Sequence, residues 1–230
     1  MTWLTPGGAA AALLVGAAVW WGLGWAGLVP LFAFLLSGSL LTRLATGTSA
    51  ARGARQVLAN GGVAAVAALL GSWAASVGAL AAAAADTWAT EIGSFSPTLP
   101  HSITTGAQVE SGRSGGITPL GTMGGVLGAI TIAGLASVFA PPQRFGLPGA
   151  MLAAAAGIVG MLTDSLLGAT LQGSYKCPVC GAVNEQGAPC HAPVQLARGV
   201  PWLDNDAVNL AGSCVGAMVA AVGWHFLGTI

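Results

Sequence analysis

Long apolar runs alternate with short polar segments along this chain of 230 residues. A membrane span requires about 20 mainly apolar residues, and the runs are continuous rather than alternating, which favours helices over barrel strands. We therefore predict an all-α, polytopic transmembrane helical bundle of six to seven spans, forming a single integral membrane domain over residues 1–230. The runs lie at 8–22, 25–42, 57–72, 73–90, 119–140, 148–171 and 207–228.

The first four runs are short and rich in Gly and Ala. They form either two hairpins of tilted or partial helices, or a different arrangement in which 57–90 is one long kinked helix. The composition agrees with a membrane location, because the chain is 54% hydrophobic and 6% charged, against about a quarter charged residues in soluble domains. The 36 Gly residues favour close packing of helices in a bilayer.

The positions of the basic residues predict the orientation of the bundle. With seven spans and a cytoplasmic N-terminus, one basic residue, Arg144, lies outside, in agreement with the positive-inside rule. The basic residues inside are Arg43, Arg52, Arg55, Arg113, Lys176 and Arg198. All the acidic residues fall on the same side, so we expect a multi-pass protein of the cell (inner) membrane with cytoplasmic polar loops. Met1–Pro6 contains no basic residue, so no cleavable signal peptide is expected.

The first polar segment, Arg43–Asn60, offers basic and amide side chains. Arg52 and Arg55 are three residues apart and share a face if the segment is helical. They either set the topology or contact a phosphate, since guanidinium matches phosphate oxygens in a bidentate way. Asn60 enters an apolar run beside two glycines, where an amide needs a partner, so it is a candidate for lining a site.

The second polar segment begins with ADTWATEIG at 85–93. Asp86 must face protein or water, because a carboxylate in lipid is costly. Glu91 lies about 140° around an ideal helix, so the two carboxylates converge only if the helix ends or loosens near Gly93. Two carboxylates at a membrane interface suit Mg²⁺, which takes oxygen ligands together with substrate phosphates. The alternative is a buried ion pair with a nearby Arg.

A run reading SGRSGG follows at 111–116. Its glycines free backbone N–H groups to point at an anion, and Arg113 adds positive charge. The run is not a Walker A loop, because no Gly-Lys-Ser/Thr follows it. We predict that it binds phosphate through Ser111, Gly112, Arg113, Ser114, Gly115 and Gly116.

The third polar segment begins inside an apolar run with TDSLLGATLQG at 163–173. Asp164, Gly168 and Gln172 are spaced to form one stripe on a helix. The segment is similar to 85–93, which indicates a weak internal repeat whose two acids could meet across a pseudo-symmetric site.

Polar residues also precede the last apolar run. Asp206, Asn209 and Ser213 have the spacing of one helix face. Asp204 and Asp206 are either metal ligands or residues that favour the N-terminus of the last helix through its dipole.

The loop at 174–200 contains Cys177-Pro-Val-Cys180 and, further along, Cys190-His191. This spacing is typical of a structural zinc site. The adjacent pair allows either His191 or a ligand from elsewhere to complete three Cys ligands. Reduced thiols, or disulfides if the topology is inverted, are the alternatives.

Taken together, these motifs resemble an integral membrane family that includes plant and cyanobacterial phytyl-phosphate kinase, over about residues 40–220. The resemblance implies transfer of phosphate from a nucleoside triphosphate, with CTP favoured, to a prenyl monophosphate in tocopherol and prenylquinone biosynthesis. CTP-dependent phytol and dolichol kinases and CDP-lipid synthases are more distantly similar. The chain departs from the kinases because its Gly-rich loop lacks Lys. The motifs are QVLANGG (56–62), ADTWATEIG (85–93), SGRSGGITPLGT (111–122), TDSLLGATLQG (163–173), the Cys/His element and WLDNDAVN (202–209).

The expected function is therefore an isoprenyl-phosphate kinase that uses Mg²⁺, with structural Zn²⁺ in the Cys loop. Phosphoryl transfer relies mainly on positioning and charge neutralisation. The expected catalytic and magnesium-binding residues are Asp86, Glu91, Asp164 and Asp206, with Asp204, Asn209 and Asn60. Residues 111–116 would hold nucleotide phosphates, and Arg52, Arg55 or Arg198 the acceptor phosphate.

Two other functions fit the same residues. One is a CTP-dependent cytidylyltransferase that makes a CDP-lipid, and the other is a lipid-phosphate transporter. The expected partners are a prenyl-phosphate lipid, a nucleotide and membrane lipids, in a chain that is also compatible with a homo-oligomer. A net charge of zero gives no indication of a nucleic-acid partner.

Overall fold

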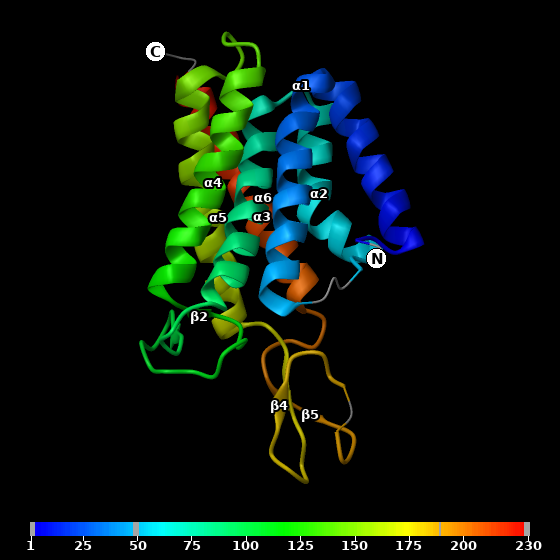
Figure 1. Cartoon of the computed structure of the whole chain (residues 1–230), viewed down its shortest axis with the longest axis vertical. Coiled ribbons are helices and arrows are strands. Elements are labelled where there is room, and N and C mark those ends of the chain that lie inside the picture. The colour runs from blue at the N-terminus through cyan, green and yellow to red at the C-terminus, as the bar shows by residue number, and fades with distance from the viewer. Residues whose placement is uncertain (1–2, 48–50, 189, 228–230) are drawn as a thin grey trace.

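The computed structural model describes residues 3–47, 51–188 and 190–227, which form a mostly helical bundle with short strands in its polar connections (Figure 1). Four parts of the predicted segments lie outside this description: residues 1–2 of the segment considered for a signal peptide, 48–50 of the first polar segment, 189 of the loop at 174–200 and 228 of the last apolar run. Among the described residues, α1, α4, α5 and α6 are long and apolar enough to cross a membrane. The helices are α1 (Pro6–Thr46), α2 (Ala54–Leu69), α3 (Trp73–Gly93), α4 (Pro119–Phe139), α5 (Gly146–Thr170) and α6 (Asn205–Leu227).

The long helix α1 is a hairpin of two arms. Gly24 has φ 70° and ψ −169°, a conformation open to glycine because it has no Cβ. The chain turns back at this residue, and the two arms run in opposite directions and spread apart away from the turn (Figure 1). The arms correspond to the separate apolar runs at 8–22 and 25–42.

The stretch 57–90 is likewise two helices, so the alternative of one long kinked helix is wrong. Gly71 has φ 73° and reverses the chain between α2 and α3. The Ser72 hydroxyl then accepts a hydrogen bond from the Ala75 N–H at 3.3 Å, which caps the start of α3.

Helix α3 lies at the centre of the bundle and packs against all five other helices. Every residue from Trp73 to Ala85 is buried. Protein rather than lipid surrounds this helix, so an Ala-rich sequence of modest hydropathy can occupy the interior. Large apolar side chains point outward from other helices instead, as Trp21 of α1 does with 88% of its surface exposed.

Facing glycines bring α3, α5 and α6 into backbone contact. A Cβ at Gly216 of α6 would lie 2.6 Å from the carbonyl oxygen of Gly78 in α3, and a Cβ at Gly78 would lie 2.6 Å from that of Gly216. A Cβ at Gly160 of α5 would lie 2.6 Å from the carbonyl oxygen of Gly212. Close backbone approach over small residues is typical of helices packed in membranes.

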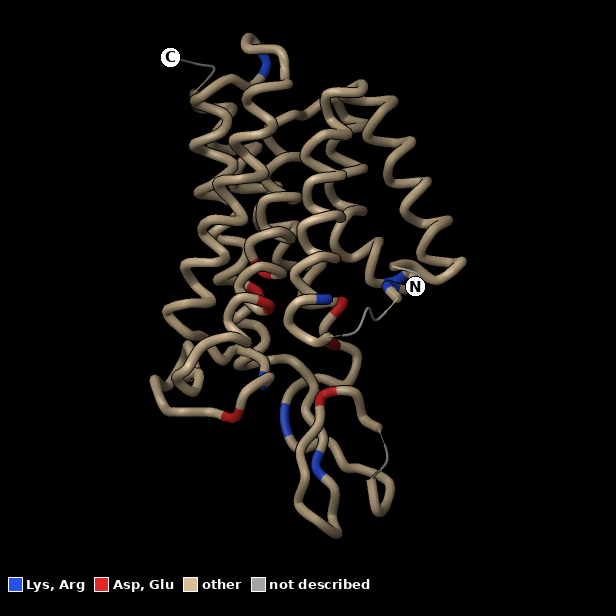
Figure 2. The backbone as a smooth tube through the Cα atoms, in the orientation of Figure 1, with Lys and Arg blue, Asp and Glu red and all other residues tan. Residues whose placement is uncertain are grey.

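Charged residues gather at one end of the bundle, here called the polar end, where the strand-bearing connections lie (Figure 2). A basic residue stands apart at the opposite end (Figure 2), where the α4–α5 connection carries Arg144. The one-sided distribution predicted from the sequence is therefore present in the fold.

The polar connections contain short strands, which corrects the expectation of an all-α fold. The strands β1 (His101–Ser102) and β2 (Gly116–Ile117) pair antiparallel between α3 and α4. Between α5 and α6, an antiparallel sheet has the order β4-β3-β5, from Ser174–Lys176 (β3), Val183–Asn184 (β4) and Gln195–Arg198 (β5). Segments of two to four residues are too short to produce a recognisable alternating pattern.

Replacement of Gly216 by Ala should destabilise the bundle. The new Cβ would overlap the Gly78 carbonyl, and overpacking of this kind costs about 1–3 kcal/mol, more than the roughly 0.5–1 kcal/mol that Ala contributes inside a helix. The apparent unfolding temperature in detergent measures the effect. Gly134→Ala is the matched control, because a Cβ there meets nothing within 4 Å. Equal unfolding temperatures for the two variants would contradict the packing described.

Candidate functional site

Two acidic side chains meet near the polar end of the bundle interior. Asp86 of α3 and Asp164 of α5 line the same narrow gap and interact electrostatically. Two carboxyl groups this close require a proton or a cation between them, because two adjacent negative charges repel strongly. The Oδ2 atom of Asp164 is buried and has no hydrogen-bond partner in the part of the chain that the structure describes. We call these two residues the acid pair.

The acid pair lines a small polar gap between four helices. Asn60 of α2 and Asn209 and Ser213 of α6 line the same gap. The Ser213 hydroxyl is also buried without a hydrogen-bond partner among the described residues. The gap thus collects oxygen atoms from α2, α3, α5 and α6, and oxygen ligands are those that Mg²⁺ prefers.

On its other side, the acid pair lines a cleft of about 310 Å³, here called the loop cleft. Thr90 of α3 and Thr118 and Thr122 at the start of α4 contribute hydroxyl groups to its wall. The SGRSGG segment covers the cleft through Ser111, Gly112, Ser114, Gly115 and Gly116. The structure therefore places this segment beside Asp86 and Asp164.

The covering segment depends on glycine at two positions. Gly112 has φ 83° and Gly115 has φ 77°, a region that favours glycine. A Cβ at Gly115 would also collide with Ala169 near the end of α5. Arg113, by contrast, is exposed and does not line the loop cleft.

A carboxylate already engages the covering segment. Glu185, in the loop after β4, accepts hydrogen bonds from the Ser114 N–H at 2.9 Å, from the Ser114 hydroxyl, and from Gln172 Nε2 at 3.0 Å. The segment predicted to bind an anion thus holds an oxyanion of the protein itself. Sequence patterns do not indicate this role for Glu185, because no local spacing links it to Ser114, 71 positions away.

Arg198 is used to fix the end of α5. Its guanidinium donates to the carbonyl oxygens of Gly168, at 3.0 Å, and of Ala169. Such contacts satisfy carbonyl groups left free at a helix C-terminus. The guanidinium of Arg198 is therefore directed to protein carbonyl groups in this structure.

Glu91 does not join the acid pair. Helix α3 continues to Gly93 without loosening, so Glu91 stays on a different face. Its carboxylate accepts a hydrogen bond from Thr42 Oγ1 of α1 at 2.6 Å, and its charge acts on Arg52. Burial lowers the pKa of Arg52, and the Glu91 carboxylate opposes that shift.

Arg55 pairs with the two acids at the start of α6. Its guanidinium lies 2.7 Å from Asp204 Oδ2 and 3.7 Å from Asp206 Oδ2. Asp204 Oδ1 also accepts from the Ala207 N–H at 3.1 Å, as expected for a helix cap. Arg52 and Arg55 consequently point to different partners, and Asp204 and Asp206 lie apart from the acid pair.

The four predicted zinc ligands converge in the loop between α5 and α6. The ligand atoms of Cys177, Cys180, Cys190 and His191 all lie within 4.8 Å of one another, so this cluster could bind a metal such as zinc. A tetrahedral zinc with bonds of about 2.3 Å to sulfur would place two sulfur ligands roughly 3.8 Å apart. Backbone N–H groups, chiefly that of Cys180, lower the pKa of Cys177 to about 6, which favours the thiolate form that binds metals.

The sequence pattern of the family described as "Integral membrane protein DUF92" matches residues 1–217. The chain belongs to this family. It is accordingly a multi-pass integral membrane protein.

Proteins from Arabidopsis, Methanocaldococcus and Synechocystis are similar to this chain. Protein PGR of Arabidopsis thaliana is 32% identical over 64% of this chain and 52% of its own length, so the chain spans about half of that relative. An uncharacterized membrane protein of Methanocaldococcus jannaschii is 30% identical over 85% of this chain and 75% of its own. One from Synechocystis is 27% identical over 94% and 81%. No solved structure matches the chain.

Replacement of Cys177 by Ser should remove a bound metal. We expect the purified wild-type protein to carry about one zinc per chain and the variant close to none, because a structural zinc site needs all four ligands. Mass spectrometry of the metal content after desalting measures this. Cys214→Ser, which alters a cysteine within α6, is the matched control and should retain the metal. Equal metal content in both variants would reject the site.

Proposed function

We propose that the protein is a kinase that transfers the γ-phosphoryl group of CTP, or another nucleoside triphosphate, to an isoprenyl monophosphate. The observation that supports this most is the acid pair, Asp86 and Asp164, beneath a Gly- and Ser-rich segment at the polar end. Resemblance of these motifs to phytyl-phosphate kinases supplies the substrate class.

In the proposed reaction, an oxygen of the lipid phosphate forms a bond to the γ-phosphorus of the nucleotide. The bond from that phosphorus to the β–γ bridging oxygen breaks, and the nucleoside diphosphate leaves with both electrons. The acceptor phosphate is already anionic near neutral pH, so no side chain has to remove a proton. The task of the protein is therefore to position two anions and reduce their repulsion.

Residues of the acid pair and the polar gap would hold Mg²⁺. Bound Mg²⁺ supplies charge neutralisation on the transferred phosphoryl group. The buried, unpartnered oxygens of Asp164 and Ser213 fit this role, with Asp86 and Asn209 beside them. Glu91, Asp204 and Asp206 are not included, because their carboxylates pair with Thr42 or Arg55.

The covering segment would hold the nucleotide phosphates. The Ser114 N–H and hydroxyl that bind the Glu185 carboxylate would bind a phosphate oxygen once Glu185 withdraws. Backbone donors in a Gly-rich turn suit this geometry. Arg113, at the exposed rim, would add positive charge where the nucleotide enters.

We further propose that all six helices, with α1 crossing twice, give seven spans, and that the polar end faces the cytoplasm. Helix α3, although modest in hydropathy, is enclosed by the other helices along its buried part and can cross with them. The gathering of basic residues at one end, with Arg144 at the other, supports the orientation.

Asp86→Asn and Asp164→Asn should each lower turnover by roughly a hundredfold or more, the scale of losing one electrostatic stabiliser at a transfer site. The assay follows nucleoside diphosphate release from CTP with phytyl monophosphate and Mg²⁺ in detergent. Glu110→Gln makes the same kind of change at an exposed residue and should leave turnover unchanged. Full activity in both Asp variants would remove the metal assignment.

The identity of the products tests the reaction itself. With labelled CTP, Mg²⁺ and phytyl or geranylgeranyl monophosphate, we expect CDP and a lipid diphosphate, resolved by mass. Pyrophosphate and a CDP-lipid would instead identify a cytidylyltransferase, which the same ligands could serve. If no acceptor in a panel of prenyl alcohols and monophosphates yields a nucleotide-dependent product, the kinase proposal fails.

Orientation can be tested with a membrane-impermeant thiol reagent on intact bacterial cells expressing the protein. In a background without other cysteines, Arg144→Cys should react from outside. A protein that keeps only Cys180, an exposed residue of the polar end, should react only after the cells are made permeable. The reverse pattern would invert the proposed topology.

A further inference from the structure

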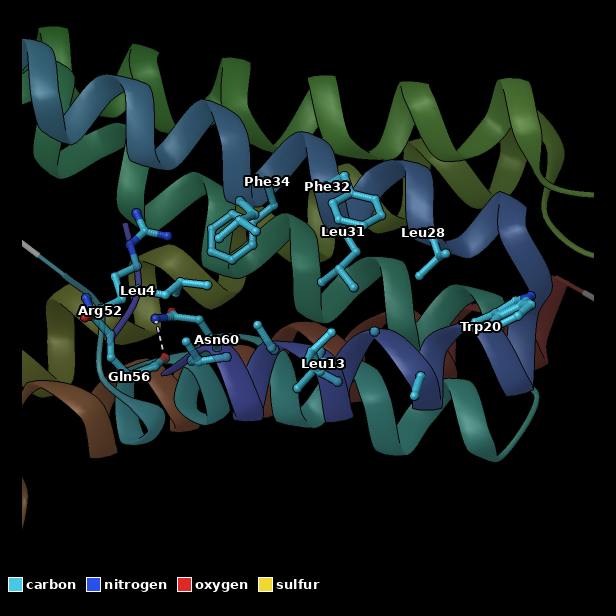
Figure 3. Close-up of a pocket in the computed structure, with 18 residues that line it drawn as sticks. Leu4, Leu13, Trp20, Leu28, Leu31, Phe32, Phe34, Arg52, Gln56 and Asn60 are labelled. Atoms are coloured by element: carbon cyan, nitrogen blue, oxygen red, sulfur yellow. Dashed lines mark hydrogen bonds between the residues drawn. The ribbon is translucent and has the colours of Figure 1, made fainter. Parts of the chain in front are cut away.

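An apolar groove of about 630 Å³ lies between the two arms of α1 and helix α2 (Figure 3). Leu13 and Trp20 of the first arm and Leu31 and Phe34 of the second contribute to its walls. Its volume is within the range of about 300–1,000 Å³ that is common for ligand sites. On the first arm, the lining residues extend from Ala9 to Trp20, about 16 Å along a helix axis.

The groove has one polar end. Arg52, Gln56 and Asn60 lie together at the end opposite Trp20 (Figure 3). Backbone hydrogen bonds from the Thr5 N–H to the Arg52 carbonyl, at 3.1 Å, and from the Arg52 N–H to the Trp3 carbonyl, at 3.0 Å, tie the start of α1 to this end. The groove thus presents a long apolar surface that finishes at a guanidinium and two amides.

We infer that this groove holds the hydrocarbon chain of one lipid whose phosphate lies at Arg52. An apolar groove in a membrane protein suits a hydrocarbon chain, and a guanidinium at one end complements a phosphate. Glu91 of α3 also acts on Arg52, so a phosphate would share the guanidinium with that carboxylate. The inference rests on the proposed function, because the lipid would be the prenyl monophosphate acceptor.

Two residues connect the groove with the polar pockets. Asn60 lines both the groove and the polar gap that contains the acid pair. Gln56 lines both the groove and a second polar pocket, which also contains Asp204 and Asp206. Asn60 therefore stands between a lipid phosphate at the polar end of the groove and the gap that holds the acid pair.

The test is photo-crosslinking without nucleotide, using a phytyl monophosphate that carries a diazirine near the end of its chain. We expect labelled peptides from α1 and α2, and much weaker labelling by the corresponding phytyl alcohol. Labelling on the outer faces of α4 and α5 would overturn the inference. Equal labelling by the alcohol would also overturn it, because the groove would then accept any bilayer chain.

Gly16→Phe provides a variant that fills the groove. Gly16 lines the groove, and a Cβ there meets nothing within 4 Å, so the larger side chain has room without displacing a helix. We expect labelling to fall by about tenfold, because the lipid chain would lose the burial of roughly two methylene groups. Gly134→Phe, on α4 and away from the groove, is the matched control and should label as the wild type does. Equal labelling of both variants contradicts the inference.

Arg52→Gln tests the place of the head group separately. The variant should lose the preference for phytyl monophosphate over the alcohol while still labelling α1 and α2. An unchanged preference would overturn the assignment of the phosphate to Arg52. Because labelling needs no turnover, a labelled groove without kinase activity would reject the proposed function and keep the groove, whereas turnover with labelling elsewhere would reject only the groove.

Discussion

The close backbone contact of α3 with α6, and of α6 with α5, is the constraint on which the rest of the structure depends. It exists because Gly78 faces Gly216 and Gly160 faces Gly212, so that a Cβ would meet a carbonyl oxygen. Because α3 lies at the centre of the bundle, Asp86 near its polar end lies close to Asp164 inside the protein. A carboxyl group in this position avoids contact with lipid. Lipid then contacts the large apolar side chains of the outer helices.

Local patterns in the sequence predicted most of the helices, because apolar runs and glycine breaks are local signals. The break at Gly71 and Ser72 separates α2 from α3, and Gly24 separates the arms of α1. The central position of α3 could not be predicted in this way, since an Ala-rich run looks the same whether lipid or protein surrounds it. The strands were missed because β1, β2 and β4 contain only two residues each.

The candidate site was predictable only where helix geometry decides the outcome. Asp86 and Asp164 occupy corresponding places in two similar segments, and both face the interior. Glu91 required α3 to loosen near its end, but the helix remains regular and Thr42 satisfies the carboxylate. The contact of Glu185 with Ser114 joins two loops far apart in the sequence, and no periodicity reports a contact of that kind.

A membrane enzyme that joins a nucleotide to a lipid must reconcile two solvents, since the nucleotide needs water and the chain needs hydrocarbon. In the proposed kinase, helix α2 would lie at this boundary, because Asn60 borders both the apolar groove and the polar gap of the acid pair. A transporter would also need polar groups toward the opposite side to release a head group there. Among the described residues, the charged residues gather at one end of the backbone, apart from Arg144 in the α4–α5 connection. This distribution is the one that the proposed kinase requires, because its chemistry would take place at one membrane surface.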